Sequence, residues 1–512
     1  MWTETMKTRI SITVLLMGLI TLFAHAQTDE PHFELTSAQA QRLMQEGKLT
    51  SEQLVNYYLN RIAMYDDGEN GLNAVVQLNS NAIAHARTLD KERASGQVRS
   101  ALHGIPVLIK DNIDTADGMA NTAGSHALAK HFPTNDAPLI SALRDAGAII
   151  LGKTNLSEWA NFRSERSSSG WSGLWGQTKN PYDKTRSPCG SSSGTGSAIA
   201  ADFAILGIGT ETDGSVVCPS AFNGIVGFKP SLGVVSASGI IPIAHSQDTA
   251  GAMTRTVADA ALLINLMASE SEDNQQTTLP DLTKHLRKDG LKDKRIGVVR
   301  SLAGRHEVVD ARFNEAIEVF RERGAVVVDD LSLSRGDMGQ HEYTVLLYEF
   351  KHDLNAYLEN AGLNLTLTDL IAFNRKNKAI QMPYFQQEIF ELANAKGSLQ
   401  EEAYLTALAE SKRLAGKDGI DALLKQHNLD LLVAPTTHAA SKIDLINGEK
   451  YLGGASSFAA IAGYPHITVP MGYVHGLPVG LSMFTGYLGE PILVEAAYDF
   501  EQASQLRKAP NL

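Results

Sequence analysis

Hydrophobic residues are spaced in two different ways along this chain of 512 residues. After the segment Thr50-Ser-Glu-Gln53, large apolar side chains recur at helical spacing at Leu54, Tyr57, Tyr58 and Ile62. Thr and Gln three positions apart form a capping box, and the apolar positions then lie along one helical face. This segment therefore predicts an amphipathic helix that opens an N-terminal helical layer.

Short continuous apolar runs give the second pattern, which is typical of strands buried on both faces of a sheet. The predicted strands are Val107–Ile109, Ala148–Leu151, Arg295–Val299, Ala325–Val328, Leu431–Val433 and Ile467–Val469. A periodic helical segment, Phe313–Arg323, separates two of these runs, and strand, helix, strand is the unit of a parallel sheet. The patterning therefore predicts an α/β fold.

Three further stretches complete the pattern. Residues 198–208 are rich in small apolar side chains and predict a closely packed helix. Residues 273–294 are polar and weakly patterned, which predicts a surface connection within one domain. Residues 331–419 contain long helical patterns, and the favoured interpretation is that their aromatic residues face the core; these include Tyr343, Tyr348, Phe350, Tyr384 and Phe385.

The N-terminus has the three regions of a secretory signal peptide. Lys7 and Arg9 precede an apolar run from Ile10 to Phe23, and Ala24-His-Ala26 follows it. A membrane anchor needs about twenty apolar residues, and this run is shorter. We expect residues 1–26 to be removed, the mature chain 27–512 to be secreted or periplasmic, and no later segment to span a membrane.

Charge and composition exclude some partners. The formal net charge is -12, and no basic patch is evident, so a phosphate backbone would be repelled. Nucleic acid is therefore not an expected partner. The chain has two cysteines, Cys189 and Cys218, which is too few for a disulfide framework, and the favoured interpretation is that both are buried thiols.

Candidate chemistry is concentrated in three segments, residues 102–111, 187–197 and 209–215. They contain many serines but no histidine signature, and a serine hydroxyl needs a group that accepts its proton. Lys110 directly follows the apolar run Val107–Ile109, so burial could lower its pKa enough for it to act as that base.

The order of these segments resembles the amidase signature family of amide-bond hydrolases, and the resemblance extends over residues 35–502. It implies a single domain over residues 27–512, built on a large mixed central sheet covered by helices on both faces. No cofactor or metal is implied. The alternative for the helical stretch 331–419 is a lid or rim that shapes the substrate cleft, as in this part of the family's fold.

The resemblance also implies the site residues. Ser215 is the expected nucleophile, Ser191, after a cis Gly190–Ser191 bond, the expected relay, and Lys110 the expected base. An acyl-enzyme would form on Ser215. The backbone N–H groups of Thr212, Asp213, Gly214 and Ser215 would form the oxyanion hole.

The positions after the expected nucleophile bear on the substrate. Relatives that cleave amides of small dicarboxylic acids have an Arg there, whereas this chain has Val216, Val217 and Cys218. We therefore expect neutral amides as substrates. The motifs, residues 246–251 among them, are most similar to those of bacterial peptide amidases, which remove the C-terminal amide from peptides.

Three alternatives differ from this interpretation. Gly190–Gly194 matches G-x-S-x-G around Ser192, and with one of His438, His466 and His475 it could form the triad of an α/β-hydrolase-type esterase. That fold needs a strand before the serine, whereas residues 180–188 are rich in turn residues. A non-catalytic amidase-like binding protein would be expected to lose Lys110, Ser191 or Ser215. The predicted leader disfavours an amidotransferase component that serves tRNA.

Overall fold

The computed structural model describes residues 33–268 and 278–512. Residues 36–512 form one compact unit. The predicted signal peptide and residues 273–277 of the predicted surface connection lie outside the described residues. Within the described part of the chain, no helix is long and apolar enough to cross a membrane.

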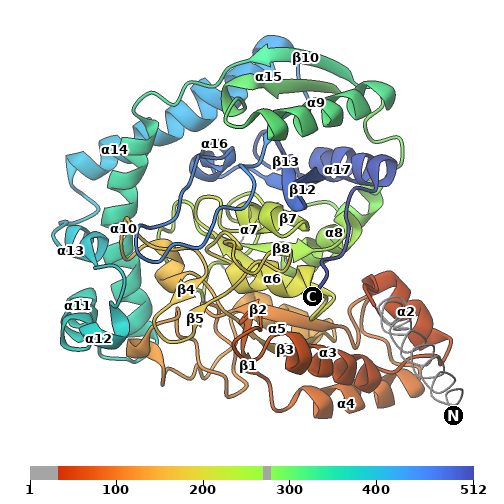
Figure 1. Ribbon diagram of the computed structural model, residues 1–512, viewed down its shortest axis with the longest axis vertical. Coiled ribbons are helices and arrows are strands. Elements are labelled where there is room, and N and C mark those ends of the chain that lie inside the picture. The colour runs from red at the N-terminus through yellow and green to blue at the C-terminus, as the bar shows by residue number, and fades with distance from the viewer. Residues whose placement is uncertain (1–32, 269–277) are drawn as a thin grey trace, which may run out of the picture. The chain divides into compact units, whose positions relative to one another are not determined.

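A mixed sheet of 11 strands forms the centre of the described residues (Figure 1). In spatial order the strands are β1 (Val75–Leu78), β3 (Ile149–Thr154), β2 (Pro106–Lys110), β6 (Leu206–Glu211), β8 (Thr249–Thr254), β7 (Val226–Lys229), β12 (His466–Val474), β13 (Leu477–Phe484), β11 (Leu431–Pro435), β9 (Arg295–Val299) and β10 (Val326–Leu331). Strands β3, β2 and β6 run parallel, as do β11, β9 and β10, and the other neighbours in the sheet are antiparallel.

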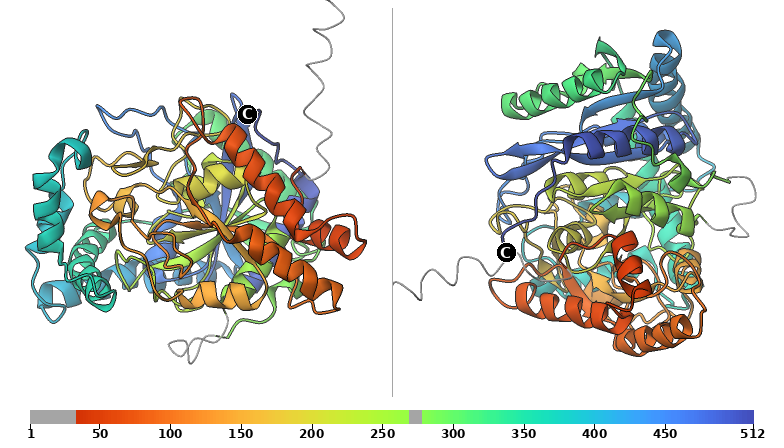
Figure 2. Two further views of the ribbon diagram at one scale, coloured as in Figure 1. Left: turned by 90° about the horizontal axis from the view of Figure 1, so that it is seen from below. Right: turned by 90° about the vertical axis from the view of Figure 1, so that its right-hand side faces the viewer.

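Helices lie on both sides of these strands, as the resemblance implied (Figure 2). The α-helices are α2 (Ser37–Gln45), α3 (Ser51–Tyr65), α4 (Ala82–Ala94), α5 (Pro138–Asp145), α6 (Ser193–Ala200), α7 (Val217–Phe222), α8 (Val257–Met267), α9 (Glu307–Glu322), α10 (Met338–Asn360), α11 (Leu367–Lys376), α12 (Lys378–Gln381), α13 (Glu388–Asn394), α14 (Glu402–Lys412), α15 (Asp421–His427), α16 (Ser456–Ala462) and α17 (Glu490–Ser504). Shorter elements are η1 (His126–Leu128), η2 (Glu158–Asn161), η3 (Leu282–His285), η4 (Arg300–Leu302), the π-helix η5 (Arg413–Ile420) and a small ribbon of β4 (Trp171–Ser172) and β5 (Gly176–Gln177).

Most elements predicted from the hydrophobic pattern are confirmed. Each of the six predicted strands corresponds to a strand of the central sheet, and α9 connects the parallel neighbours β9 and β10. The capping box of α3 has both of its hydrogen bonds. Gln53 N donates to Thr50 Oγ1 at 3.1 Å, and Thr50 N donates to Gln53 Oε1 at 2.9 Å.

The predicted helix over residues 198–208 is wrong. Helix α6 begins earlier, at Ser193 inside the Gly/Ser-rich segment, and Leu206 already belongs to strand β6. Close packing explains the difference, because a Cβ on Gly207 would lie 2.6 Å from Thr195 Cγ2 of α6. The small residues on both sides of the turn thus let a helix and the next strand approach closely, instead of extending one helix.

Helices α10 to α14 form a separate group at one side of the sheet (Figure 1). Phe350 of α10 and Phe390 of α13 are fully buried and pack with Trp159 and Phe162 in one hydrophobic cluster. The interpretation that aromatic residues of this stretch face a core is confirmed for Phe350, Tyr348 and Phe385, whereas Tyr384 is exposed.

Candidate active site

Lys110 is the last residue of β2, which lies between the parallel strands β3 and β6. Its side chain is fully buried. The Nζ atom lies 2.8 Å from Ser191 Oγ, 2.7 Å from Thr210 Oγ1 and 3.2 Å from the Thr210 carbonyl oxygen. Burial lowers the pKa of Lys110 to about 7, although the charges of Asp248 and Glu211 oppose the shift. A neutral amine is therefore accessible near neutral pH.

Ser191 lies in the loop that precedes α6. The Gly190–Ser191 peptide bond is cis, as the resemblance implied. A Cβ on Gly190 would lie 2.2 Å from Ser157 Oγ, so a larger residue would displace the Ser157 side chain. Ser157 N donates to the Ser191 carbonyl at 3.0 Å. These contacts hold the loop before α6, in which the Ser191 hydroxyl lies against Lys110.

Ser215 ends the turn between β6 and α7. Gly214 in this turn has a φ of +84°, which favours glycine, and its missing Cβ would lie 3.0 Å from Ser456 Oγ. The turn is joined to the Ser191 segment because Ser192 N donates to the Ser215 carbonyl at 3.1 Å. The structure thus brings together the three segments that carry Lys110, Ser191 and Ser215.

A buried carboxylate fixes the end of the turn. Glu211 Oε2 accepts hydrogen bonds from Val216 N at 2.8 Å and Val217 N at 3.0 Å. Within residues 33–268 and 278–512, the backbone N–H groups of 213–215 have no hydrogen-bond acceptor. Donors held in place without a partner are what a developing oxyanion needs.

Sequence reasoning missed two supporting residues. Thr210 holds Lys110 Nζ through both its hydroxyl and its carbonyl, and this threonine belongs to the segment 209–215. Asp248 accepts hydrogen bonds from Thr212 Oγ1 and from the backbone N–H groups of Ile243 and Ala244. Burial raises the pKa of Asp248 to about 6. The place of Asp248 within the motif of residues 246–251 is the signal that could have indicated this role.

The interpretation of the cysteines as free thiols is wrong. Cys189 and Cys218 form a disulfide, with their Cα atoms 5.9 Å apart. They are 29 positions apart in sequence, and only the approach of α7 to the Ser191 loop brings them within bonding range. Cys189 comes two residues before Ser191 and Cys218 three residues after Ser215. The bond thus ties together the segments that carry both serines.

A cavity of about 400 Å³ opens beside Ser215. The disulfide cysteines and residues 212–215 line one part of it. Leu346 of α10, Ile389 of α13 and Arg335 line another part, so residues of the stretch 331–419 contribute to the cavity. Acidic side chains around the cavity are Glu165, Asp213 and Glu449.

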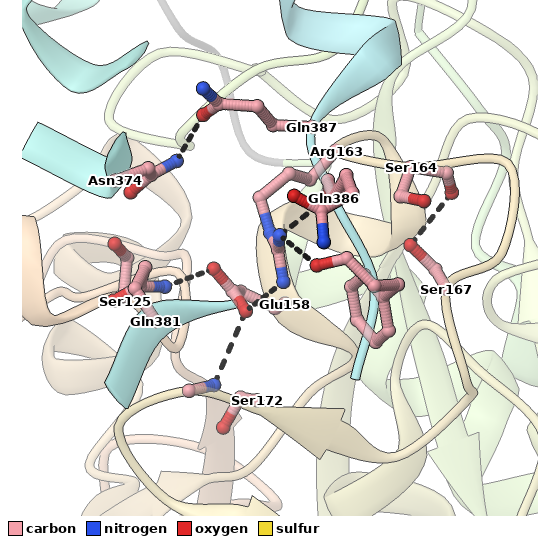
Figure 3. A network of polar contacts seen from close by, with 12 residues as sticks. Ser125, Glu158, Arg163, Ser164, Ser167, Ser172, Asn374, Gln381, Gln386 and Gln387 are labelled. Carbon is pink, nitrogen blue, oxygen red and sulfur yellow. Dashed lines mark hydrogen bonds and ion pairs between the residues drawn. The ribbon is translucent and has the colours of Figure 1, made fainter. Parts of the chain in front are cut away.

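A buried ion pair attaches the helical group to the cavity wall (Figure 3). Arg163 Nη2 lies 3.1 Å from Glu158 Oε2, and both side chains are almost fully buried. Gln381 of α12 donates to the other oxygen of Glu158, and Arg163 Nη1 donates to the carbonyls of Phe385 and Gln386. Burial raises the pKa of Glu158 to about 7, and the charge of Arg163 opposes the shift. Residues 160–169, several of which line the cavity, are thereby joined to α12 and to the segment that precedes α13.

The structure does not support the esterase triad around Ser192. Ser192 Oγ is buried and donates to the Thr210 carbonyl at 3.1 Å, and it accepts from Thr210 N at 3.2 Å. His466 Nε2 forms a hydrogen bond with Ser482 Oγ at 2.6 Å, and burial lowers the pKa of His466 to about 3. His438 Nδ1 forms a hydrogen bond with the carbonyl oxygen of Ala439. Neither Ser192 nor these two histidines form a nucleophile and base pair.

One group in the described part of the chain has metal-ligand character: His245, Glu349 and Asp353. These side chains already form hydrogen bonds with one another and with other residues. His245 Nδ1 lies 2.8 Å from Asp353 Oδ2, and Glu349 Oε1 accepts from Tyr404 OH at 2.7 Å. His245 and Asp353 line a different cavity from Ser215. We assign no metal role to this group.

Comparisons with known proteins agree with the geometry. The family model described as Amidase matches residues 53–494, which is most of the chain. A probable amidase of Arabidopsis thaliana is 37% identical over 91% of this chain and 89% of its own length. The similarity therefore extends over the sheet, the helical group and all three segments that carry Lys110, Ser191 and Ser215.

Solved structures show the same fold. The native peptide amidase from Stenotrophomonas maltophilia superposes with a TM-score of 0.90 at 46% identity, covering 94% of this chain and 99% of that one. An amidase family protein from Bacillus anthracis superposes with a TM-score of 0.84 at 37% identity, covering 94% and 93%. The chain is therefore an amidase and belongs to the amidase signature family.

Proposed function

We propose that this enzyme hydrolyses neutral carboxylic amides, with C-terminally amidated peptides as its substrate class. The observation that carries the mechanism is the contact of buried Lys110 Nζ with Ser191 Oγ at 2.8 Å. Because the pKa of Lys110 is lowered to about 7, its neutral amine can accept a proton from Ser191. Ser191 in turn accepts the proton of Ser215.

Ser215 Oγ then attacks the amide carbonyl carbon. The carbonyl oxygen gains negative charge, and the backbone N–H groups of residues 212–215 stabilise it. When the C–N bond breaks, the relay returns a proton to the leaving nitrogen, so ammonia departs from a primary amide and an acyl-enzyme remains on Ser215. Water attacks this ester, again giving its proton to the relay, and the free carboxylic acid leaves.

The cavity supports neutral substrates. Val216 and Val217 follow the nucleophile, and neither offers a cation to a substrate carboxylate. Arg335 also lines the cavity, but three acidic side chains, Glu165, Asp213 and Glu449, line it as well. A carboxylate placed there would be desolvated among like charges, which is unfavourable. The 46% identity with a peptide amidase supports the same substrate class.

The test measures ammonia release from amidated peptides, with malonamate and free glutamine for comparison. We expect a much higher kcat/KM for the amidated peptides. Ser215→Ala, Ser191→Ala and Lys110→Ala should each lose most of the activity, and intact-mass measurement with a slow substrate should find the acyl group on Ser215. His475→Ala is the control. Preference for the two acids would contradict the substrate class, and an active Ser215→Ala would contradict the mechanism.

We also propose that the protein works outside the cytoplasm. The Cys189–Cys218 disulfide supports this, because such bonds persist in oxidising compartments. N-terminal sequencing of the protein from its native compartment should begin near Gln27. A soluble cytoplasmic protein that retains Met1 would contradict export.

A further inference from the structure

A carboxylate within the nucleophile turn has an unsatisfied oxygen. Asp213 Oδ2 accepts a hydrogen bond from Ser457 Oγ at 2.7 Å. Asp213 Oδ1 is buried, and no donor among the described residues reaches it. A buried carboxylate oxygen without a donor is costly, so an additional proton source at this position is expected.

Glu342 of α10 faces this carboxylate. Its Oε1 accepts a hydrogen bond from Gln247 Nε2 at 3.0 Å, and the same nitrogen lies 3.3 Å from the carbonyl oxygen of Thr212. Gln247 thus links Glu342 to one end of the turn, while Asp213 lies at its middle. Two adjacent carboxylates in a partly buried site repel each other when both are ionised. A proton on Glu342 would remove that repulsion and give Asp213 its missing donor.

We infer that Glu342 is a positioning residue, whose carboxyl proton bridges to Asp213 and, with Gln247, holds the turn of residues 212–215 in place. This inference rests on the proposed function, because it assigns the turn to the nucleophile and the oxyanion hole. Glu342 touches no reacting atom. It acts by keeping the backbone N–H groups of 213–215 directed at the substrate.

Electrostatics gives the direction of the pH dependence. Burial, followed by the charge of Asp213, raises the pKa of Glu342 to about 8, while Gln247 and the charge of Arg335 lower it. Tyr451 also faces Asp213 and is about half exposed; partial burial and the charge of Asp213 together raise its pKa to about 12, so it stays neutral. Below about pH 8 Glu342 therefore holds its proton. Above that pH Glu342 loses its proton beside Asp213, the turn loses its clamp and kcat falls.

The first experiment compares Glu342→Gln, Glu342→Ala and the control Glu359→Gln, which makes the same charge change on an exposed part of α10. The amide introduced by Glu342→Gln can donate to Asp213 and accept from Gln247 at every pH. We expect this variant to keep kcat and lose the alkaline fall. Glu342→Ala should lower kcat about ten- to hundredfold with little change in KM, because the turn shifts. Glu359→Gln should match the wild type.

The second readout does not depend on catalysis. Infrared difference spectra of the wild type taken below and above about pH 8 should show the loss of a protonated carboxyl stretch, and Glu342→Gln should lack that signal. An alkaline fall that persists in Glu342→Gln, a wild-type kcat in Glu342→Ala, or an unchanged infrared signal would overturn the inference. Activity in Ser215→Ala would instead overturn the proposed mechanism and leave the infrared result standing.

Discussion

The two sides of the active site are built differently. On one side, residues 187–229 form α6, α7 and their strands from buried residues, many of them small, and Gly194 and Gly196 pack closely against nearby segments of the same chain. On the other side, α10 and α13 carry large aromatic residues that pack with Trp159 and Phe162 in one hydrophobic cluster. The first side fixes the positions of backbone and hydroxyl groups, and the second supplies side chains that shape the cavity. We therefore expect the first side to govern kcat and the second side, apart from Glu342 beside the nucleophile turn, to govern KM.

The largest effect should come from the base. Lys110→Ala removes the proton acceptor from the tightly packed side, and general-base loss costs about 10²–10⁴-fold in kcat. Steady-state ammonia release measures it. Leu346→Ala, on the helical side of the cavity, should change KM more than kcat. A large fall of kcat in Leu346→Ala would break the division between the two sides.

The pH profile of kcat tests the same division between the two sides of the active site. Only the neutral amine of Lys110 accepts a proton, and burial lowers its pKa to about 7, so kcat should rise as pH increases through about 7. The alkaline fall assigned to Glu342 comes from the helical side. The acid limb should therefore remain in Glu342→Gln. A rate that is independent of pH on both sides of the Lys110 pKa of about 7 would contradict the role of Lys110.

Breaking the attachment between the sides should mainly affect stability. Arg163→Met leaves Glu158 buried without its cation and costs about 3–5 kcal/mol of unfolding free energy. Arg375→Met removes an exposed pair with Glu391 on the helical side and should cost less than about 1 kcal/mol. Urea denaturation compares the two. Equal costs would show that the Figure 3 network does not join the two sides.

The disulfide tests the rigidity of the tightly packed side. Replacing both Cys189 and Cys218 with Ser should lower the free energy of unfolding by about 2–4 kcal/mol, because a closed loop limits the unfolded chain. We also expect kcat to fall, since the bond joins the segments of Ser191 and Ser215. The matched measurement is wild-type enzyme treated with a thiol reductant. A double variant with unchanged stability and kcat would show that packing alone holds these segments.

The smallest predicted effect concerns α3, which belongs to neither side of the active site. Thr50→Ala removes the cap of α3, and the loss of such a cap costs about 1 kcal/mol. Thermal unfolding should register this loss, while kcat and KM stay unchanged. A change in kcat would mean that the N-terminal helices influence the site, and the comparison would then need a third region.

The sequence was sufficient where local pattern and local chemistry agree. The capping box of α3 and the apolar runs of β2, β3, β9 and β11 predicted real elements, because a strand buried on both faces needs a continuous apolar run. The placement of Lys110 at the end of a buried strand followed from the same run. The helix predicted over residues 198–208 was wrong, because small residues favour both a close-packed helix and a close-packed strand. Only the packing of Gly207 on Thr195 shows where the helix ends and the strand begins.

The sequence by itself determined which groups could do the chemistry: a lysine after an apolar run, serines between glycines, and no histidine signature. Tertiary structure decided what surrounds them. The disulfide, the contacts of Thr210 and Asp248, and the approach of Glu342 to Asp213 all join residues far apart in the chain. Hydrophobic patterning acts within a few residues, whereas hydrogen bonds and pKa shifts depend on distances that exist only after the sheet has brought its strands together.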